Sequence, residues 1–202
     1  MGIFDFKDMI KVIIFDVGNT YLDGSFVDFV NKSRRILGMD ENFYTDKEIF
    51  FDKRLNKGEI TIEECLKNYF KVPISDQQMK KIIVVWTSNW KLSNEMKELV
   101  IRLKKNYRLA ILSNSDLLNS SIYTKKGWYK YFDTLILSHE LGILKPEKEI
   151  YEVTIEKLGV KPNECLFIDD QEDCLKPARE MGMATILYKS VSQLKDDLKN
   201  IL

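Results

Sequence analysis

The chain has 202 residues, of which 45% are hydrophobic, and its 31 Lys and Arg side chains balance 31 Asp and Glu side chains. This length allows one full hydrophobic core and a small inserted subdomain. The sequence has no long run of one charge sign of the kind that binds nucleic acid, and no apolar run approaches the roughly 20 residues of a membrane helix. We therefore expect neither nucleic-acid nor membrane binding.

Three cysteines, Cys65, Cys165 and Cys174, form an odd set without metal-type spacing. No basic region followed by an apolar stretch marks the N-terminus as a signal peptide. We therefore expect a reducing, cytoplasmic setting.

The first predicted strand, Val12 to Phe15, is followed directly by Asp16 and a turn containing Gly18 and Asn19. A carboxylate at the carboxyl end of a central strand is expected to be exposed at the ligand-binding edge of a sheet, among backbone N–H groups. Asp16 is therefore a candidate nucleophile. Taken alone, an Asp at a strand end is more often a turn or cap residue.

The next stretch, residues 25–90, has helical periodicity and no convincing strand. Thr61 with Glu64 is a capping-box pattern, and Ser75 is a plausible second helix start. We interpret this stretch as a small helical cap inserted after the first strand, above the ligand-binding edge. The remaining residues, 1–24 and 91–202, would form the catalytic core. The alternative is that residues 25–90 simply extend that core.

The second predicted strand, residues 109–112, leads into Ser113 and Asn114. A hydroxyl and an amide at the start of the next helix would suit an anion, because backbone donors and the helix dipole favour negative charge there. The same residues are also preferred as ordinary helix caps.

The third predicted strand, residues 134–137, is followed by Lys145, Pro146 and Glu147. Pro146 and Glu147 suit the opening of a helix. Lys145 would neutralise a phosphate and keep Asp16 ionised, although a solvated loop lysine is the simpler reading. The helix is expected to run through residues 150–158 and end at Gly159.

The fourth predicted strand, residues 165–168, ends in Asp169 and Asp170, and a fifth strand covers residues 184–187. Two adjacent carboxylates repel one another, so a cation nearby would help both to stay ionised. Magnesium prefers carboxylates, backbone carbonyls and water. The alternative is an acidic turn.

The alternation of strands and helices predicts an α/β fold, a doubly wound parallel sheet of Rossmann-like type with helices on both faces. In such a sheet all four polar clusters fall at the same end of their strands. Their joint occurrence is far less probable by chance than any one of them.

These clusters resemble the four ordered motifs of the haloacid dehalogenase-like hydrolase superfamily: Asp16 with Thr20, Ser113-Asn114, Lys145-Pro146 and Asp169-Asp170. The stretch from 137 to 146 is especially similar to its phosphatase and dehalogenase branches. The resemblance covers the whole chain, and the helical insertion stands where those branches carry a small cap.

The resemblance implies a two-step phosphatase mechanism. Asp16 attacks phosphorus to form an aspartyl phosphate, which water then hydrolyses. Mg²⁺ would be bound by the Asp16 carboxylate, the backbone carbonyl of Gly18 and the Asp169 carboxylate, with Asp170 in support.

The same resemblance implies phosphate-binding roles for Ser113, Asn114 and Lys145, which would hold the phosphoryl oxygens in line with Asp16. We also expect Asn19 and Thr20 to contribute to substrate binding. The implied substrate is a small phosphorylated metabolite.

Gly18 departs from the family pattern, because most of these phosphatases carry there a second Asp that acts as general acid and base. Losing such a group typically costs ~10²- to 10⁴-fold in rate unless the leaving group is good. The stretch from Asp16 to Asn19 is nonetheless similar to a branch containing a phosphatase of α-glucose 1-phosphate, whose anomeric leaving group needs less protonation. A sugar 1-phosphate is therefore the expected substrate. Asp23 is a possible substitute acid and base, although it also suits a simple turn.

Several alternatives remain open at the sequence level. A hydrolytic dehalogenase would use the same Asp nucleophile without a metal, and a phosphonate hydrolase would need a cap lysine such as Lys53 or Lys57. A sugar-phosphate mutase would rely on the second Asp that is missing here. A catalytically impaired member would bind a phosphorylated ligand or a protein.

A few other residues have no assigned chemistry. Lys53, Arg54, Trp86 and Trp90 would face either the site or a core, because helical spacing does not decide between them. Cys174 and His139 are expected to be structural.

Overall fold

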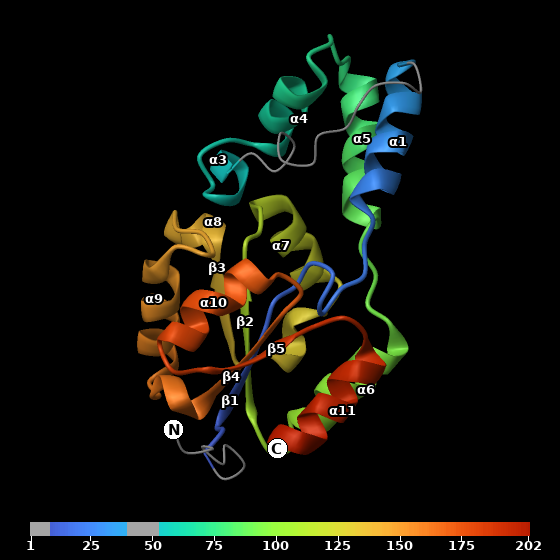
Figure 1. The fold of residues 1–202 in the computed structure, drawn as a ribbon. Coiled ribbons are helices and arrows are strands. Elements are labelled where there is room, and N and C mark those ends of the chain that lie inside the picture. Colours follow the sequence, from blue (N-terminus) through green and yellow to red (C-terminus); the bar gives the residue numbers. More distant parts are fainter. Residues whose placement is uncertain (1–8, 40–52) are drawn as a thin grey trace.

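The computed structural model describes residues 9–39 and 53–202. These residues form a five-stranded parallel sheet in the order β3-β2-β1-β4-β5, flanked by helices (Figure 1). The strands are β1 (Val12–Phe15), β2 (Arg108–Ser113), β3 (Thr134–Leu137), β4 (Cys165–Asp169) and β5 (Ala184–Leu187). The five predicted strands and the fold class are therefore confirmed.

The central strand β1 is inaccessible to solvent at all four positions, and its side chains alternate between the two faces of the sheet. Ile13 and Phe15 join one hydrophobic cluster, whereas Val12 and Ile14 join the other. The first cluster is covered by α6 (Asn94–Leu103), α7 (Leu117–Lys125) and α11 (Val191–Ile201). The second is covered by α9 (Lys148–Leu158) and α10 (Glu172–Glu180). The shorter elements are α8 (Ser138–Leu141), η1 (Tyr129–Tyr131) and η2 (Pro162–Glu164).

Among the described residues, a group of helices lies above the edge at which β1 ends (Figure 1). They are α1 (Phe26–Leu37), α3 (Lys53–Asn56), α4 (Ile62–Phe70) and α5 (Asp76–Ser88). The helices share a separate hydrophobic cluster that includes Phe29, Leu66 and Ile82. The capping box expected at Thr61 is present, and the helix start expected at Ser75 is confirmed and also has a capping box. This separate core supports our proposal that residues 25–90 form a cap, of which residues 40–52 lie outside the described part.

The two segments that join this helical group to the sheet are paired with each other. Asp23 N–H donates to Lys91 O and Lys91 N–H donates to Asp23 O, each at 2.9 Å. On another side, Ser138 Oγ donates to the Asn56 carbonyl at 2.6 Å, and Lys57 Nζ lies 3.1 Å from Glu147 Oε1. The helical group is therefore held to the sheet domain by contacts beyond its chain connections.

One helix boundary differs from the expectation. The helix predicted to open at Pro146 and Glu147 begins instead at Lys148, with Glu147 as the residue before it. The reason is that residues 144–147 form a turn, in which Glu147 N–H donates to Leu144 O at 2.7 Å. The helix can begin only after this turn. The predicted end is confirmed, because Gly159 follows Leu158 with a left-handed φ of 63°.

None of the helices in the described ranges combines the length and apolar character that a membrane span requires.

Candidate active site

The carboxyl ends of β1 and β4 meet at the point where the chain order of the sheet reverses. From β1 the chain continues to β2 and β3 on one side, and later returns to β4 and β5 on the other. Asp16 follows β1 directly, Asp169 is the last residue of β4, and Asp16 N–H donates to Ile168 O at 2.9 Å. Open α/β sheets bind ligands at this switch point, beyond the carboxyl ends of the strands. The two carboxylates therefore lie at the position expected for an active site.

Lys145 joins these two carboxylates. Its Nζ lies 2.7 Å from Asp16 Oδ1 and 2.6 Å from Asp169 Oδ2. The three residues are only 5%, 6% and 0% exposed, respectively. An ammonium group removed from water between two carboxylates is a specific arrangement rather than a solvated loop lysine.

Asn114 fixes the position of Lys145. Its Nδ2 donates to the Lys145 carbonyl at 2.9 Å, and its Oδ1 accepts from Lys145 N–H at 2.8 Å. Both polar atoms of the Asn114 side chain are therefore engaged with the backbone of the Lys145 loop. We propose that Asn114 acts on the site mainly by positioning Lys145.

The charges in the site depend strongly on burial. Burial raises the pKa of Asp16 to about 7, against the opposing effect of Lys145. Burial alone would lower the pKa of Lys145, but the charges of Asp16 and Asp169 outweigh it and hold that pKa above its ordinary value. The ammonium therefore stays charged. Burial and the neighbouring Asp169 also raise the pKa of Asp170.

The donor set fits a divalent cation. Asp16, Asp169 and Asp170 each offer a carboxylate oxygen, and these atoms lie within 4.8 Å of one another. Asp170 Oδ1 is buried and has no hydrogen-bond partner among the described residues. Three carboxylates facing one ammonium leave an excess of negative charge, and hard oxygen ligands are those that Mg²⁺ prefers. The Gly18 carbonyl as a further ligand remains a prediction.

The other predicted site residues lie on the same edge. Ser113 is the last residue of β2, which pairs with β1, and it is 3% exposed. Thr20 is 1% exposed and lies near Asp170. Asn19 is exposed and takes a left-handed φ of 55° in the turn after β1. Their contacts with substrate remain predictions.

The exposure expected for Asp16 is wrong, since this residue is buried. The loop after β1 turns back on itself, with Tyr21 N–H and Leu22 N–H both donating to Val17 O at 3.1 and 2.8 Å. A tight turn immediately after the strand end shields Asp16 from solvent.

Two residues without assigned chemistry, Cys174 and His139, have surroundings that fit the structural role expected of them. Cys174 is buried, and burial raises its pKa to about 12, so the thiol stays protonated near neutral pH. His139 Nδ1 lies 3.1 Å from Ser115 O and 3.3 Å from Ser115 Oγ.

The two tryptophans of the cap segment have different surroundings. Trp86 is buried in the cap cluster, where its ring lies 4.8 Å from that of Phe29. Trp90 packs instead against the core cluster of the sheet domain and against Gly18 and Gly24. Helical spacing in the sequence could not predict this difference, because residue 90 lies outside any helix.

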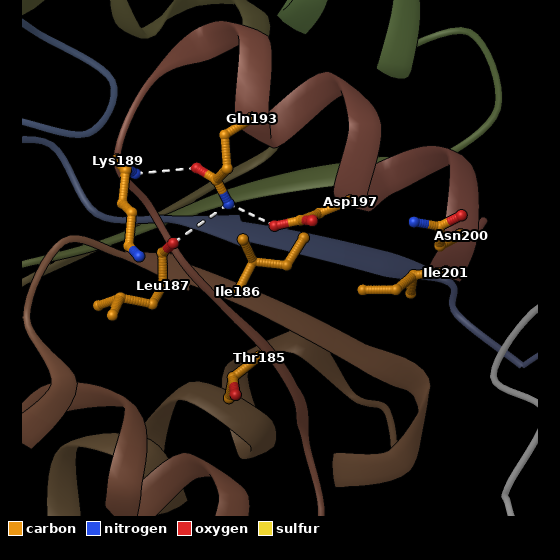
Figure 2. A pocket seen from close by; sticks show the side chains of 8 residues that line it. All are labelled: Thr185, Ile186, Leu187, Lys189, Gln193, Asp197, Asn200 and Ile201. Atoms are coloured by element: carbon orange, nitrogen blue, oxygen red, sulfur yellow. Dashed lines mark hydrogen bonds between the residues drawn. The ribbon is translucent and has the colours of Figure 1, made fainter.

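A hollow of about 460 Å³ lies along the edge strand β5 and helix α11 (Figure 2). The Gln193 side chain crosses it, donating from Nε2 to Leu187 O at 3.2 Å and accepting at Oε1 from Lys189 N–H at 2.9 Å. None of the three site carboxylates lines this hollow. It is therefore separate from the candidate active site.

Known proteins are similar to this chain in both sequence and fold. The bifunctional epoxide hydrolase 2 of Sus scrofa is 30% identical over 166 residues, which are 73% of this chain and 30% of that protein. The chain spans between 13% and 30% of the length of the rat, mouse and pig forms. D-ribitol-5-phosphate phosphatase of Bacteroides thetaiotaomicron is 24% identical over 210 residues, covering 96% of this chain and 99% of that one.

Among solved structures, a HAD family enzyme of the same bacterium, in complex with magnesium and inorganic phosphate, matches with a TM-score of 0.73. It is 27% identical, and the match covers 89% of this chain and 94% of that one. Residues 10–182 also match the family of haloacid dehalogenase-like hydrolases as a whole. The chain therefore belongs to the haloacid dehalogenase-like hydrolase family.

Proposed function

We propose that this hydrolase is a magnesium-dependent phosphatase of small phosphorylated metabolites that uses Asp16 as its nucleophile. The observation that carries the proposal is the buried Lys145 ammonium, in contact with both Asp16 and Asp169 at the switch point of the sheet. Named relatives support the substrate class, since they include phosphatases of D-ribitol 5-phosphate and glyceraldehyde 3-phosphate.

In the proposed reaction, an Asp16 carboxylate oxygen forms a bond to phosphorus while the leaving oxygen departs with the electron pair of the P–O bond. Water then attacks the same phosphorus and releases Asp16. Lys145 favours the anionic form of Asp16, against the effect of burial, and offers positive charge to the phosphoryl oxygens. When bound, Mg²⁺ would be held by Asp16, Asp169 and Asp170 and would supply positive charge against the phosphate.

Removal of magnesium is the first test. Chelation is expected to lower release of p-nitrophenol from p-nitrophenyl phosphate by on the order of 10³-fold, because the excess negative charge of the site would then oppose the substrate. Added Mg²⁺ should restore turnover and raise the melting temperature of the free enzyme. Full activity after chelation would contradict the proposed dependence on magnesium.

Leaving-group preference is the second test. Without a carboxylate at Gly18, anomeric sugar 1-phosphates should exceed the matching 6-phosphates in kcat/KM by about 10- to 100-fold, because the anomeric oxygen departs more easily without a proton. Both esters of one hexose serve as a matched pair. Equal or better hydrolysis of the 6-phosphate would contradict the proposed substrate class.

Asp23 remains a proposal as substitute acid and base. Its side chain is exposed, and its printed hydrogen bonds to Lys91 are made by the backbone. Asp23→Asn should lower turnover on alkyl phosphates by about 10-fold or more if Asp23 transfers the proton. Unchanged turnover would exclude it.

A further inference from the structure

The indole of Trp90 lies against two glycines, Gly18 within the turn that follows β1 and Gly24 just after that turn. A Cβ built on Gly18 would lie 3.3 Å from Trp90 Cη2 and 3.6 Å from Cζ3. A Cβ built on Gly24 would lie 2.5 to 2.9 Å from Cε3, Cζ3 and Cδ2, closer than side-chain carbons approach one another. The ring therefore occupies space that side chains at these positions would need.

Backbone conformation does not explain either glycine. Six other glycines in the described ranges have a positive φ, and neither Gly18 nor Gly24 is among them. An L-residue is therefore compatible with the backbone at both positions. What restricts positions 18 and 24 is the contact with Trp90.

Trp90 is held in this place by its neighbour in the chain. Lys91 makes two backbone hydrogen bonds to Asp23, the residue before Gly24. Trp90 also packs against the hydrophobic cluster of the sheet domain, whereas Trp86 belongs to the cap cluster. The indole is thus fixed to the turn that follows the nucleophile.

We propose that Trp90 acts on leaving-group specificity through Gly18: its indole occupies the space that a side chain at position 18 would need, and so prevents a carboxylic acid at that position from acting as proton donor. This inference rests on the proposed phosphatase function. A Cβ at position 18 alone requires the indole to shift by a few tenths of an ångström, and each further atom of a longer side chain would need more room.

The chemical consequence concerns the leaving oxygen. When the P–O bond breaks, its electron pair stays on that oxygen, which then takes a proton or carries the charge itself. A carboxylic acid at position 18 would start two residues from the nucleophile and donate that proton. Because Gly18 has no such group, the leaving group must depart as an anion or take its proton from elsewhere.

The first experiment measures kcat/KM for a series of aryl and alkyl phosphates. The wild-type value is expected to fall by ~10²- to 10⁴-fold from p-nitrophenyl phosphate to an alkyl phosphate. Gly18→Asp alone should leave this ratio within about 3-fold of wild type, whereas Gly18→Asp with Trp90→Ala should shrink it at least ~10-fold. Trp90→Ala alone should not shrink it. Trp128→Phe is a matched control, because this indole also packs on the sheet-domain cluster but is not among the atoms that confine Gly18.

The inference is overturned if Gly18→Asp shrinks the ratio of kcat/KM between p-nitrophenyl phosphate and an alkyl phosphate equally with and without Trp90. A folded double variant that binds inorganic phosphate yet keeps the wild-type ratio would overturn it as well. Trp90→Leu serves as a second background if Trp90→Ala does not fold.

A second experiment does not depend on activity, so it separates this inference from the proposed function. Gly18→Ala should lower the melting temperature by about 2–4 °C in the wild type, and by less than about 1 °C in Trp90→Leu, where the ring is absent. Equal losses in the two backgrounds would show that Trp90 does not confine position 18. If the wild type hydrolyses no phosphate ester, the proposed function fails. The comparison of melting temperatures still tests whether Trp90 restricts position 18.

Discussion

Asp16→Asn is expected to lower phosphatase turnover by on the order of 10⁴- to 10⁶-fold, the scale at which hydrolases lose activity without their nucleophile. Asn has almost the same shape but cannot form an acyl phosphate. The variant should fold, because Lys145 keeps its contact with Asp169 and one buried carboxylate is removed rather than left unpaired. Steady-state hydrolysis of p-nitrophenyl phosphate measures the loss, and circular dichroism measures the fold.

Two further observations make this prediction decisive. Acid quenching of wild-type turnover should leave a phosphorylated peptide containing Asp16, and the variant should yield none. Asp173→Asn, which changes an exposed carboxylate of α10, should stay within about 3-fold of wild type as expected for a surface substitution. Substantial turnover by Asp16→Asn would exclude covalent catalysis at this residue.

Lys145→Met is expected to lower turnover by on the order of 10³-fold and the free energy of unfolding by about 3–5 kcal/mol. The catalytic loss follows because positive charge facing the phosphoryl group disappears. The loss of stability follows because Asp16 and Asp169 would face each other without the buried ammonium between them. Urea denaturation in the presence of a chelator measures the second effect without compensation by a bound cation.

Lys57→Met is the matched control for Lys145→Met. It also removes one lysine from an ion pair, but the side chains of Lys57 and Glu147 are 25% and 41% exposed. Solvent screening should keep its effect on stability within about 1 kcal/mol. If the two variants lost equal stability, the contact between Lys145 and the two carboxylates would not have the energetic importance assigned to it.

The sequence by itself determined the strands and the ends of several helices. Runs such as Val12 to Phe15 are apolar at every position, which suits a strand covered on both faces, and local rules identified the capping box at Thr61 and the helix start at Ser75. The order of polar clusters at strand ends also indicated the family and the candidate residues. These features are readable because each depends on residues close together in the chain.

Only the tertiary structure decided how distant residues meet. Asp16 and Lys145 are 129 residues apart, and their contact depends on β1 lying between β2 and β4. The same packing commits the Asn114 amide to the Lys145 backbone, buries Asp16 and places Trp90 against Gly18. Residue type and spacing specify which groups are available at a sheet edge. The packing of whole helices and strands decides which of these groups touch and how far water is excluded. No local sequence pattern predicts that packing.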